Sequence, residues 1–541
     1  MVLLSLLVGL AASPFVLGAA YYPRRSTQQV TTSYGTVQGA TSDLNSAVNV
    51  YKGIPFATPP IGDLRWTAPT APSNWTGTLN ATSFGADCAQ SYSALGLFSS
   101  GSEDISEDCL YMNIWTPANA TSTSNLPIYV WIYGGRFEGG AGSVPTYDGS
   151  HLASKDIVVV NFNYRMGPFG FLAHPELNAE SGHNASGNYG LLDQIQALTF
   201  VQSEIATFGG NPDHITVGGQ SAGSASALDM MYSPLSSVKI VATIAESGAR
   251  GPHDPETYGL ATAHRTKAAA EGSGITFLAE MNVTSIAELR NVSMDDLLVY
   301  DNSGDTVLDG TVFKNSSAIQ EPPLWRPVID GYVLPYLYGE SLRLNTHGDI
   351  PILTGDNKGE TSDDTMTLAE YEEGFTEIMG NLSAAFFEAY PATDAATAGN
   401  MSFAFWDDVN RVSTYDWAQA WYGGGATNDV FVYYWTHAPP NQTAGAYHGS
   451  ELWYVFGNIP TYYNLTWTTQ DYALQTQMSA YWANFIKTGN PNGGNLTTFP
   501  ANTENVTEVM WLGDSTGSSY LTQNTSGFTV IQEFFSQQIE F

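Results

Sequence analysis

The chain has 541 residues, of which 43% are apolar and 13% aromatic, enough to build a large hydrophobic core. Its 18 basic and 52 acidic side chains give a formal net charge of −34, so nucleic acids and anionic membranes are excluded as partners. No internal repeat or linker divides the sequence, and we expect residues 21–541 to form one catalytic domain of the α/β class.

The first twenty residues are predicted to be a secretory signal peptide. Residues 2–12 are almost wholly apolar, and the small residues 18–20 that follow are the expected cleavage region, although no basic segment precedes the apolar run. No other apolar run approaches the ~18 residues that span a bilayer. We therefore expect a secreted, extracellular protein without an integral membrane segment.

Glycosylation sequons and cysteines agree with secretion. The asparagines that begin an N-x-S/T sequon are Asn74, Asn80, Asn119, Asn184, Asn282, Asn291, Asn315, Asn381, Asn400, Asn441, Asn464, Asn495, Asn505 and Asn524. The only two cysteines are Cys88 and Cys109, which an oxidising compartment would join in one disulfide. Closing that loop would stabilise the fold by roughly 3 kcal/mol, and the alternative is two buried free thiols.

Hydrophobic periodicity predicts strands that alternate with helices. Compact apolar runs with β-branched residues are typical of strands buried on both faces, and helical spacing of apolar residues appears over 191–206 and 222–231. The predicted strands lie at 31–34, 48–51, 126–133, 157–162, 215–217, 240–245, 350–354 and 430–436. Such alternation favours a mainly parallel sheet flanked by helices, with the helical or irregular segments 255–345 and 362–427 over the strand ends.

A G-x-S-x-G motif runs from Gly219 to Gly223 and centres on Ser221. An apolar strand leads into it and a helix leads out, which is the context that a nucleophilic serine on a tight turn requires. The residues two before and two after the serine must lack bulk, and glycine occupies both positions. The motif is short enough to arise by chance, but its flanking elements favour a catalytic serine.

A serine hydroxyl becomes a useful nucleophile only when a base takes its proton and an acid orients that base. Glu360, just after the predicted strand 350–354, is the candidate acid. Asp356, Asp363 and Asp364 compete with it, and spacing does not decide between them.

The candidate base is His448, which lies beyond the predicted strand 430–436 among small residues that suit a crowded site. His437 competes with it, but His437 sits at the strand end before two prolines and is typical of a structural residue. The order serine, acid, histidine is that of α/β-hydrolases.

The developing negative charge on the substrate oxygen also needs hydrogen-bond donors. Gly134 and Gly135 follow the predicted strand 126–133 and could aim backbone N–H groups at one point, although an ordinary glycine turn would look the same. The second donor would be the N–H of Ala222, at the start of the helix after the serine. No phosphate-binding loop, H-E-x-x-H or C-x-x-C motif is present, and we expect no metal and no cofactor.

Taken with further motifs, the chain resembles the type-B carboxylesterase/lipase family, which includes cholinesterases, secreted lipases and sterol esterases, and the non-catalytic neuroligins. The resemblance covers most of residues 30–500. Its motifs lie at Tyr51–Ala57, Ser106–Trp115, Asn163–Phe171, Gly187–Gln194, Phe208–Pro212, Tyr481–Phe485 and Thr488–Pro491, in family order.

The resemblance implies an α/β-hydrolase fold with long insertions, and a role for each matching residue. Ser221 would be the nucleophile, His448 the general base and acid, and Glu360 its orienter. Backbone N–H groups of Gly135, Arg136 and Ala222 would form the oxyanion hole. The remaining implied residues are the disulfide Cys88–Cys109, the buried ion pairs Arg65–Glu107 and Arg165–Asp193, and Ser247 near the acid.

The chain departs from the family at three places. Arg136 replaces a usual glycine, so its side chain must either pair with a carboxylate such as Glu138 or point into the substrate pocket. Gln220 replaces a usual carboxylate, which makes a protonated His448 less favourable. The loop between the cysteines lacks the tryptophan with which cholinesterases bind quaternary ammonium, which argues against a cholinesterase.

These observations predict a secreted, glycosylated serine hydrolase that forms an acyl-enzyme with a small-molecule ester. The loop between the cysteines is short but apolar at Tyr92, Leu95, Leu97 and Phe98, so soluble esters of short-to-medium acyl chains are the expected substrates. A lipase or sterol esterase acting on long-chain lipid esters is the alternative. An adhesion module similar to neuroligins is a further one, against which the complete set of catalytic residues argues.

Overall fold

A computed structural model of the protein describes residues 28–91, 96–259, 264–316, 318–344, 348–360, 365–459, 465–502 and 508–540. Several sequence predictions lie outside the described residues. They are the signal peptide, the sequon asparagines Asn464 and Asn505, the competing acids Asp363 and Asp364, and the apolar residues Tyr92 and Leu95.

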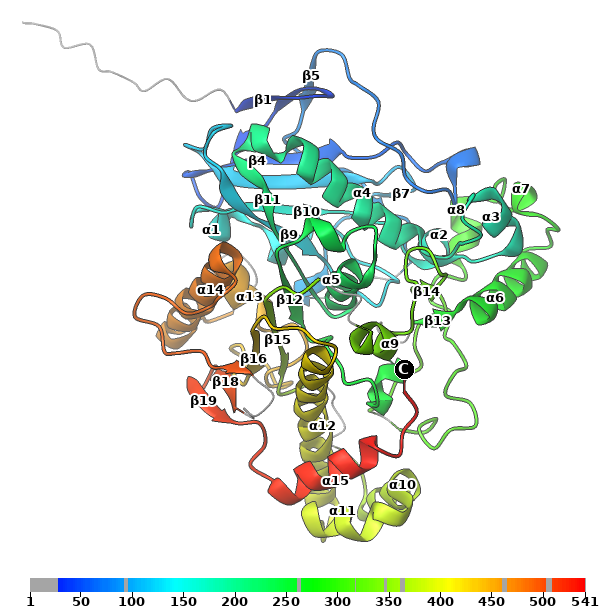
Figure 1. The fold of residues 1–541 in the computed structure, drawn as a ribbon, viewed down its shortest axis with the longest axis vertical. Coiled ribbons are helices and arrows are strands. Elements are labelled where there is room, and N and C mark those ends of the chain that lie inside the picture. Colours follow the sequence, from blue (N-terminus) through cyan, green and yellow to red (C-terminus); the bar gives the residue numbers. More distant parts are fainter. Residues whose placement is uncertain are drawn as a thin grey trace, which may run out of the picture.

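A twelve-stranded mixed sheet forms the centre of the molecule (Figure 1). Its spatial order is β19 (Gly517–Tyr520), β18 (Glu508–Leu512), β16 (Val430–Trp435), β15 (Ile352–Asn357), β12 (Ala242–Glu246), β11 (Gly210–Gln220), β9 (Leu126–Ile132), β10 (Val158–Phe162), β8 (Tyr111–Pro117), β4 (Val48–Pro55) and β3 (Ala40–Thr41), with β17 (Ala501–Asn502) beside β16. From β10 to β18 every neighbouring pair is parallel, and the outer strands are antiparallel. The predicted mainly parallel sheet is confirmed.

Helices cover both faces of this sheet, which explains why its central strands are buried throughout. Figure 1 shows α13 (Leu452–Phe456) and α14 (Thr469–Thr488) on one side, and α4 (Tyr189–Glu204), α5 (Ala222–Tyr232) and α12 (Ala395–Gly423) on the other. The long helices α12 and α14 both begin with a capping box. The side chain of the residue before the helix accepts from the backbone N–H of the third helical residue, and the side chain of that third residue accepts from the backbone N–H of the residue before the helix.

Within their described parts, the predicted helical segments 255–345 and 362–427 hold helices α6 to α12 joined by irregular chain. In the second of them, α10 (Leu368–Met379) and α11 (Ser383–Ala389) pack with α15 (Thr525–Phe535) at the lower end of the view in Figure 1. The remaining elements are β1 (Gln29–Thr32), β2 (Gly35–Gln38), β5 (Thr78–Asn80), β6 (Asp87–Cys88), β7 (Ile105–Ser106), β13 (Arg265–Thr266), β14 (Val328–Ile329), α1 (Ser150–Ala153), α2 (Gly167–Phe171), α3 (Pro175–Glu180), α6 (Lys267–Glu280), α7 (Ile286–Leu289), α8 (Met294–Leu298) and α9 (Tyr338–Arg343).

Strands β11 and β15 extend beyond their predicted ends, and both differences bear on the site. β11 runs to Gln220, directly before Ser221, and β15 runs to Asn357 rather than stopping at residue 354. Because parallel strands end at one edge of a sheet, the residues that follow β11, β15 and β16 converge there. No helix among the described residues is long and apolar enough to cross a membrane.

Candidate active site

Ser221 stands between the end of β11 and the start of α5 in a strained backbone conformation, with φ 60° and ψ −124°. A Cβ on Gly219 would lie 2.2 Å from the carbonyl oxygen of Gly223, and one on Gly223 would lie 2.0 Å from that of Ile132. Any side chain at either position would therefore collide with backbone. The two glycines of the motif are needed for the turn, as the sequence predicted.

The imidazole of His448 and the carboxyl group of Glu360 form a hydrogen bond between Nδ1 and Oε2. The other carboxyl oxygen of Glu360 accepts bonds from Ser247 Oγ at 2.5 Å and from the backbone N–H of Asn357 at 2.7 Å. The loops also meet through their backbones, since Gly359 N–H donates to the Ala446 carbonyl at 2.9 Å. Two of these bonds thus join the acid loop to the base loop, and the other two hold the Glu360 carboxylate in place.

Electrostatics favours the charged form of both partners. Burial would raise the pKa of Glu360, but His448 and the hydrogen bonds outweigh it, so the pKa of this carboxyl group is lowered. Burial would likewise lower the pKa of His448, but the Glu360 carboxylate outweighs it and the pKa of the imidazole is raised. The Glu360 side chain is 4% exposed and that of His448 38%, so the base opens toward solvent while the acid does not.

The competing residues that the structure describes have other partners. Asp356 accepts a hydrogen bond from Thr414 Oγ1. His437 lies between Asp471 and Asp514, at 3.0 Å and 2.7 Å. Neither Asp356 nor His437 contacts the Glu360–His448 pair.

The turn after β9 lies against Ser221. A Cβ on Gly134 would lie 2.9 Å from the Ser221 Cβ, and Gly135, Arg136 and Phe137 all have positive φ angles, of 116°, 60° and 62°. This turn and the start of α5 bring the N–H groups predicted to form the oxyanion hole to the same region. Among the described residues, no hydrogen bond occupies the N–H of Gly135, Arg136 or Ala222.

The Arg136 side chain turns away from Ser221. Its guanidinium bonds Glu138 Oε2 at 3.2 Å, Gln320 Oε1 at 3.3 Å and the Glu321 carbonyl at 2.8 Å. The expected pairing with Glu138 is present, and the guanidinium is committed to these acceptors rather than to the pocket.

Gln220 is fully buried and touches the base directly. Its Nε2 lies 2.9 Å from Nε2 of His448, and within the described part of the chain its Oε1 has no hydrogen-bond partner. Because Nδ1 of His448 is engaged by Glu360, the neutral imidazole presents a lone pair at Nε2, which accepts from the Gln220 amide. Among the described residues, Ser221 Oγ makes no hydrogen bond, so Gln220 occupies the atom that must receive the serine proton.

The loop closed by the disulfide is anchored to both halves of the site. Cys88 and Cys109 are joined, with their Cα atoms 4.9 Å apart. Gln90 and Gly140 exchange two hydrogen bonds, at 3.0 Å and 2.8 Å, which tie the loop to the turn after β9. On the other side, the Phe98 ring lies against Gly449, next to the base.

The two predicted ion pairs are present; Arg165–Asp193 is buried, whereas Glu107 of the other pair is partly exposed. Arg65 bonds both carboxyl oxygens of Glu107. Arg165 bonds both oxygens of Asp193, at 2.8 Å each.

The described sequon asparagines are exposed, with one exception. Asn524 is partly buried and caps α15: its Oδ1 accepts from Gly527 N–H at 2.9 Å, and its Nδ2 donates to the Ala389 carbonyl at 3.1 Å. A glycan on Nδ2 would displace that second bond, so the prediction of glycosylation at Asn524 conflicts with its role in the fold.

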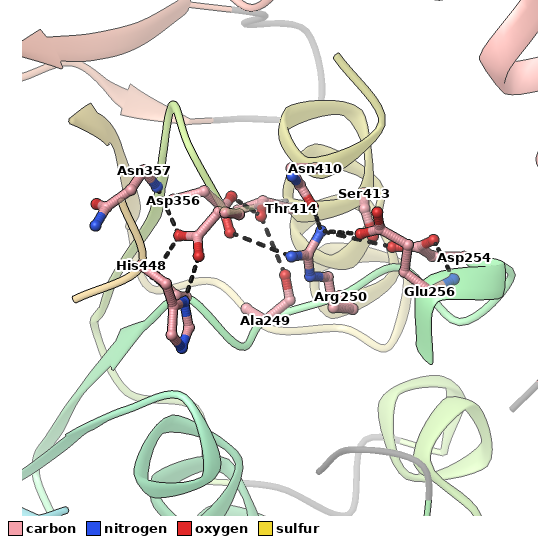
Figure 2. Close-up of polar contacts among 12 residues, drawn as sticks. Ala249, Arg250, Asp254, Glu256, Asp356, Asn357, Asn410, Ser413, Thr414 and His448 are labelled. Carbon is pink, nitrogen blue, oxygen red and sulfur yellow. Dashed lines mark hydrogen bonds and ion pairs between the residues drawn. The ribbon is translucent and has the colours of Figure 1, made fainter. Parts of the chain in front are cut away.

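One group near the triad has no sequence signature. Arg250 lies three residues after Ser247 among buried carboxyl groups, and Figure 2 shows Asp356 between Arg250 and His448. Its neighbours come from three separate segments, so no spacing rule could have found them.

Comparison with known proteins agrees with this geometry. The sequence profile of the Carboxylesterase family matches residues 26–529. The fumonisin B1 esterase of Sphingopyxis macrogoltabida is 34% identical over 517 residues, covering 93% of this chain and 91% of that protein. The para-nitrobenzyl esterase of Bacillus subtilis is 32% identical over 498 residues, covering 90% and 94%.

The solved structure of a PNB esterase superposes with a TM-score of 0.73 at 30% identity, covering 94% of this chain and 100% of that one. Profile, relatives and superposition all extend over nearly the whole chain. This chain therefore belongs to the carboxylesterase family, and it is an ester hydrolase with the α/β-hydrolase fold.

Proposed function

We propose that the protein is a secreted, glycosylated serine carboxylesterase that works through an acyl-enzyme on soluble esters of short-to-medium acyl chains. The observation that carries the mechanism is the bond between Nδ1 of His448 and Glu360, which leaves Nε2 as the proton acceptor beside the strained serine turn.

In this mechanism Ser221 Oγ attacks the ester carbonyl carbon while Nε2 of His448 takes the hydroxyl proton. The carbonyl oxygen becomes an oxyanion that accepts hydrogen bonds from the N–H groups of Gly135, Arg136 and Ala222. The intermediate then collapses, the carbon–oxygen bond to the alcohol breaks, and the alcohol leaves with the proton from His448. Water, deprotonated by the same imidazole, then attacks the acyl carbon. The bond from that carbon to Ser221 Oγ breaks, Oγ takes the proton back from His448, and the carboxylic acid leaves.

Gln220 adds a step to this sequence. Its amide must release Nε2 of His448 before the base can accept the serine proton. Once His448 is protonated, a rotation of the Gln220 amide by 180° would let the imidazolium donate to Oε1. Catalytic hydrogen bonds commonly form only when substrate is bound, so this resting arrangement is compatible with activity.

Support for soluble substrates comes from the loop between the cysteines. It is short, and within its described part Leu97 is buried and Phe98 is packed on Gly449, which leaves little apolar surface for a lipid interface. Support for secretion comes from the disulfide and from the exposed sequons.

The test is kcat/KM for p-nitrophenyl esters of rising acyl length, with the long-chain esters measured both dissolved and emulsified. We expect a maximum at short-to-medium chains and no gain at an interface. Fastest hydrolysis of emulsified long-chain esters would instead identify a lipase. Mass spectrometry of protein from culture medium would check the secretion proposal, since a retained N-terminal segment and unmodified asparagines would contradict it.

A further inference from the structure

Arg250 is the centre of a buried cluster in which carboxyl groups outnumber cations. It is 3% exposed and lies on the loop after β12. Its Nη1 is 3.1 Å from Glu256 Oε2 and 3.7 Å from Asp254 Oδ2, and its Nη2 is 4.0 Å from Asp356 Oδ1. All three carboxyl groups are buried. One guanidinium thus faces three acids, with Glu360 as a fourth acid within electrostatic range.

This cluster joins the two backbone segments that hold Glu360. Ser247, which donates to Glu360, precedes Arg250 by three residues in the same loop. Asn357, whose N–H also donates to Glu360, follows Asp356 directly at the end of β15. Figure 2 shows Arg250 between Asp254 and Glu256 on one side and Asp356, toward His448, on the other. The Arg250–Asp356 contact therefore links the Ser247 loop to the Asn357 turn.

Helix α12 closes the cluster with neutral hydrogen-bonding groups. Thr414 Oγ1 bonds both Asp356 and the Ala249 carbonyl, and Ser413 Oγ accepts from Gly251 N–H at 2.9 Å. Asn410 Oδ1 accepts from Arg250. The guanidinium supplies the only positive charge among these residues, so without it the acids would have no cation to balance them.

We propose that Arg250 is a positioning residue of the esterase reaction: by joining the Ser247 loop to the end of β15, it fixes the Glu360 carboxylate against His448. The inference rests on the proposed function, because it assumes that Glu360 and His448 serve Ser221. Burial raises the pKa of Asp356 to about 7, so this acid can hold a proton beside Glu360 near neutral pH. Arg250 also opposes protonation of His448, whose pKa its charge lowers.

The test compares Arg250→Met and Arg250→Lys with the wild type in full pH profiles of kcat and KM. We expect Arg250→Met to lower kcat roughly 10- to 100-fold with little change in KM, because the substrate pocket is untouched while the acid loses its alignment. The acidic limb of the profile should move to higher pH, because the charge that opposes protonation of His448 is gone. Arg250→Lys keeps that charge and should recover part of kcat with the limb unmoved.

The matched control is Arg411→Met on α12. Arg411 is also a buried arginine between two carboxyl groups, those of Asp407 and Asp408, and it contacts neither Glu360 nor the loop of Ser247. We expect this variant to lose stability with kcat and the pH profile unchanged.

Wild-type kcat and an unmoved limb in Arg250→Met, or equal losses of kcat in the two methionine variants, would overturn the proposal. If Arg250→Met does not fold, Arg250→Lys decides alone, since a shift of its acidic limb as large as one pH unit would contradict the role of the charge. An active Ser221→Ala variant would instead refute the proposed function itself, so the two failures are distinguishable.

Discussion

Two arginines of this protein, Arg165 and Arg250, are equally buried but differ in how many carboxyl groups surround them. Arg165 is 4% exposed and forms two bonds of 2.8 Å with a single carboxylate, Asp193, so each charge has one partner. Arg250 is 3% exposed and faces three carboxyl groups at 3.1 to 4.0 Å. The balanced pair lies in the core between β10 and α4, whereas the unbalanced cluster lies beside Glu360.

The difference indicates what each region contributes. A matched pair leaves no charge unpaired, and removing one partner is expected to destabilise the fold. An excess of buried carboxyl groups over cations destabilises the fold and shifts the pKa values of those groups. Shifted pKa values of this kind are concentrated at functional sites. We therefore assign stability to the Arg165 region and function to the Arg250 region, and the following predictions test that division.

The largest effect on activity is expected from substitution of Ser221, the proposed nucleophile. Ser221→Ala should lower kcat/KM on p-nitrophenyl acetate by ~10⁴-fold or more, because no nucleophile remains. The Tm should be unchanged, since alanine keeps the Cβ of Ser221 and, among the described residues, Ser221 Oγ makes no hydrogen bond. Substantial activity in this variant would show that Ser221 is not the nucleophile and would contradict the function assigned to the Arg250 region.

The second prediction concerns the balanced pair. Arg165→Met leaves Asp193 buried without its cation, and we expect the free energy of unfolding to fall by about 3–5 kcal/mol. The kcat of the folded fraction should stay within about twofold of the wild type, since Arg165 touches no residue of the site. Denaturant unfolding measures the free energy of unfolding, and active-site titration gives the kcat of the folded fraction. A large fall in kcat with unchanged stability would contradict the assignment of stability to the Arg165 region.

The third prediction follows from the excess of acids. Burial raises the pKa of Glu246 to about 8, and it raises that of Asp356 to about 7 despite the opposing charge of Arg250. The folded state therefore binds more protons than the unfolded state between about pH 4 and pH 8, and stability falls as pH rises through this window. The lowered pKa values of Glu360, Asp349, Asp471 and His151 act in the opposite direction, but the three carboxyl groups titrate near or below the lower end of this window.

Thermal unfolding should accordingly show a Tm several degrees higher near pH 5 than near pH 8. Glu246→Gln removes one of the titrating groups and should flatten the dependence. A Tm that rises steadily from pH 5 to pH 8 in the wild type would show that these acids are ionised in the fold.

The smallest effect is expected at Gln220. Gln220→Glu places a carboxylate about where the amide now contacts Nε2 of His448, which stabilises the imidazolium. The acidic limb of kcat/KM should move up by about one pH unit or less, with the alkaline plateau nearly unchanged. A limb that does not move would mean that the amide contact is absent in solution.

Some of this site was predictable because its signals are local. The turn at Ser221 needs two glycines at fixed positions, and the order of Ser221, Glu360 and His448 follows the order of the strands. Spacing could not decide between Asp356 and Glu360, and only the family resemblance favoured Glu360, because the choice depends on where β15 ends. The strand continues to Asn357, so Asp356 lies within the strand and bonds Thr414 of α12, while Glu360 lies in the turn beyond it.

Other features depend on contacts between distant segments. The guanidinium of Arg136 could not be placed until the segment at Gln320 and Glu321 was seen to supply its acceptors. The Arg250 cluster draws on residues 250–256, 356 and 410–414, which share no pattern. Sequence patterns indicate what a single helix, strand or turn requires. A polar cluster depends on how several elements pack together, which those patterns do not show.

The central claim, that Ser221 is the nucleophile and that the Glu360–His448 pair activates it, is tested most directly by covalent labelling. The wild-type protein is treated with a p-nitrophenyl alkylphosphonate, and its intact mass and peptide map are measured alongside released p-nitrophenol and residual activity. We predict one adduct per chain on Ser221, appearing in step with loss of activity, and a sharply reduced labelling rate in His448→Gln. An adduct on another serine, or complete inactivation with Ser221 unmodified, would contradict the account.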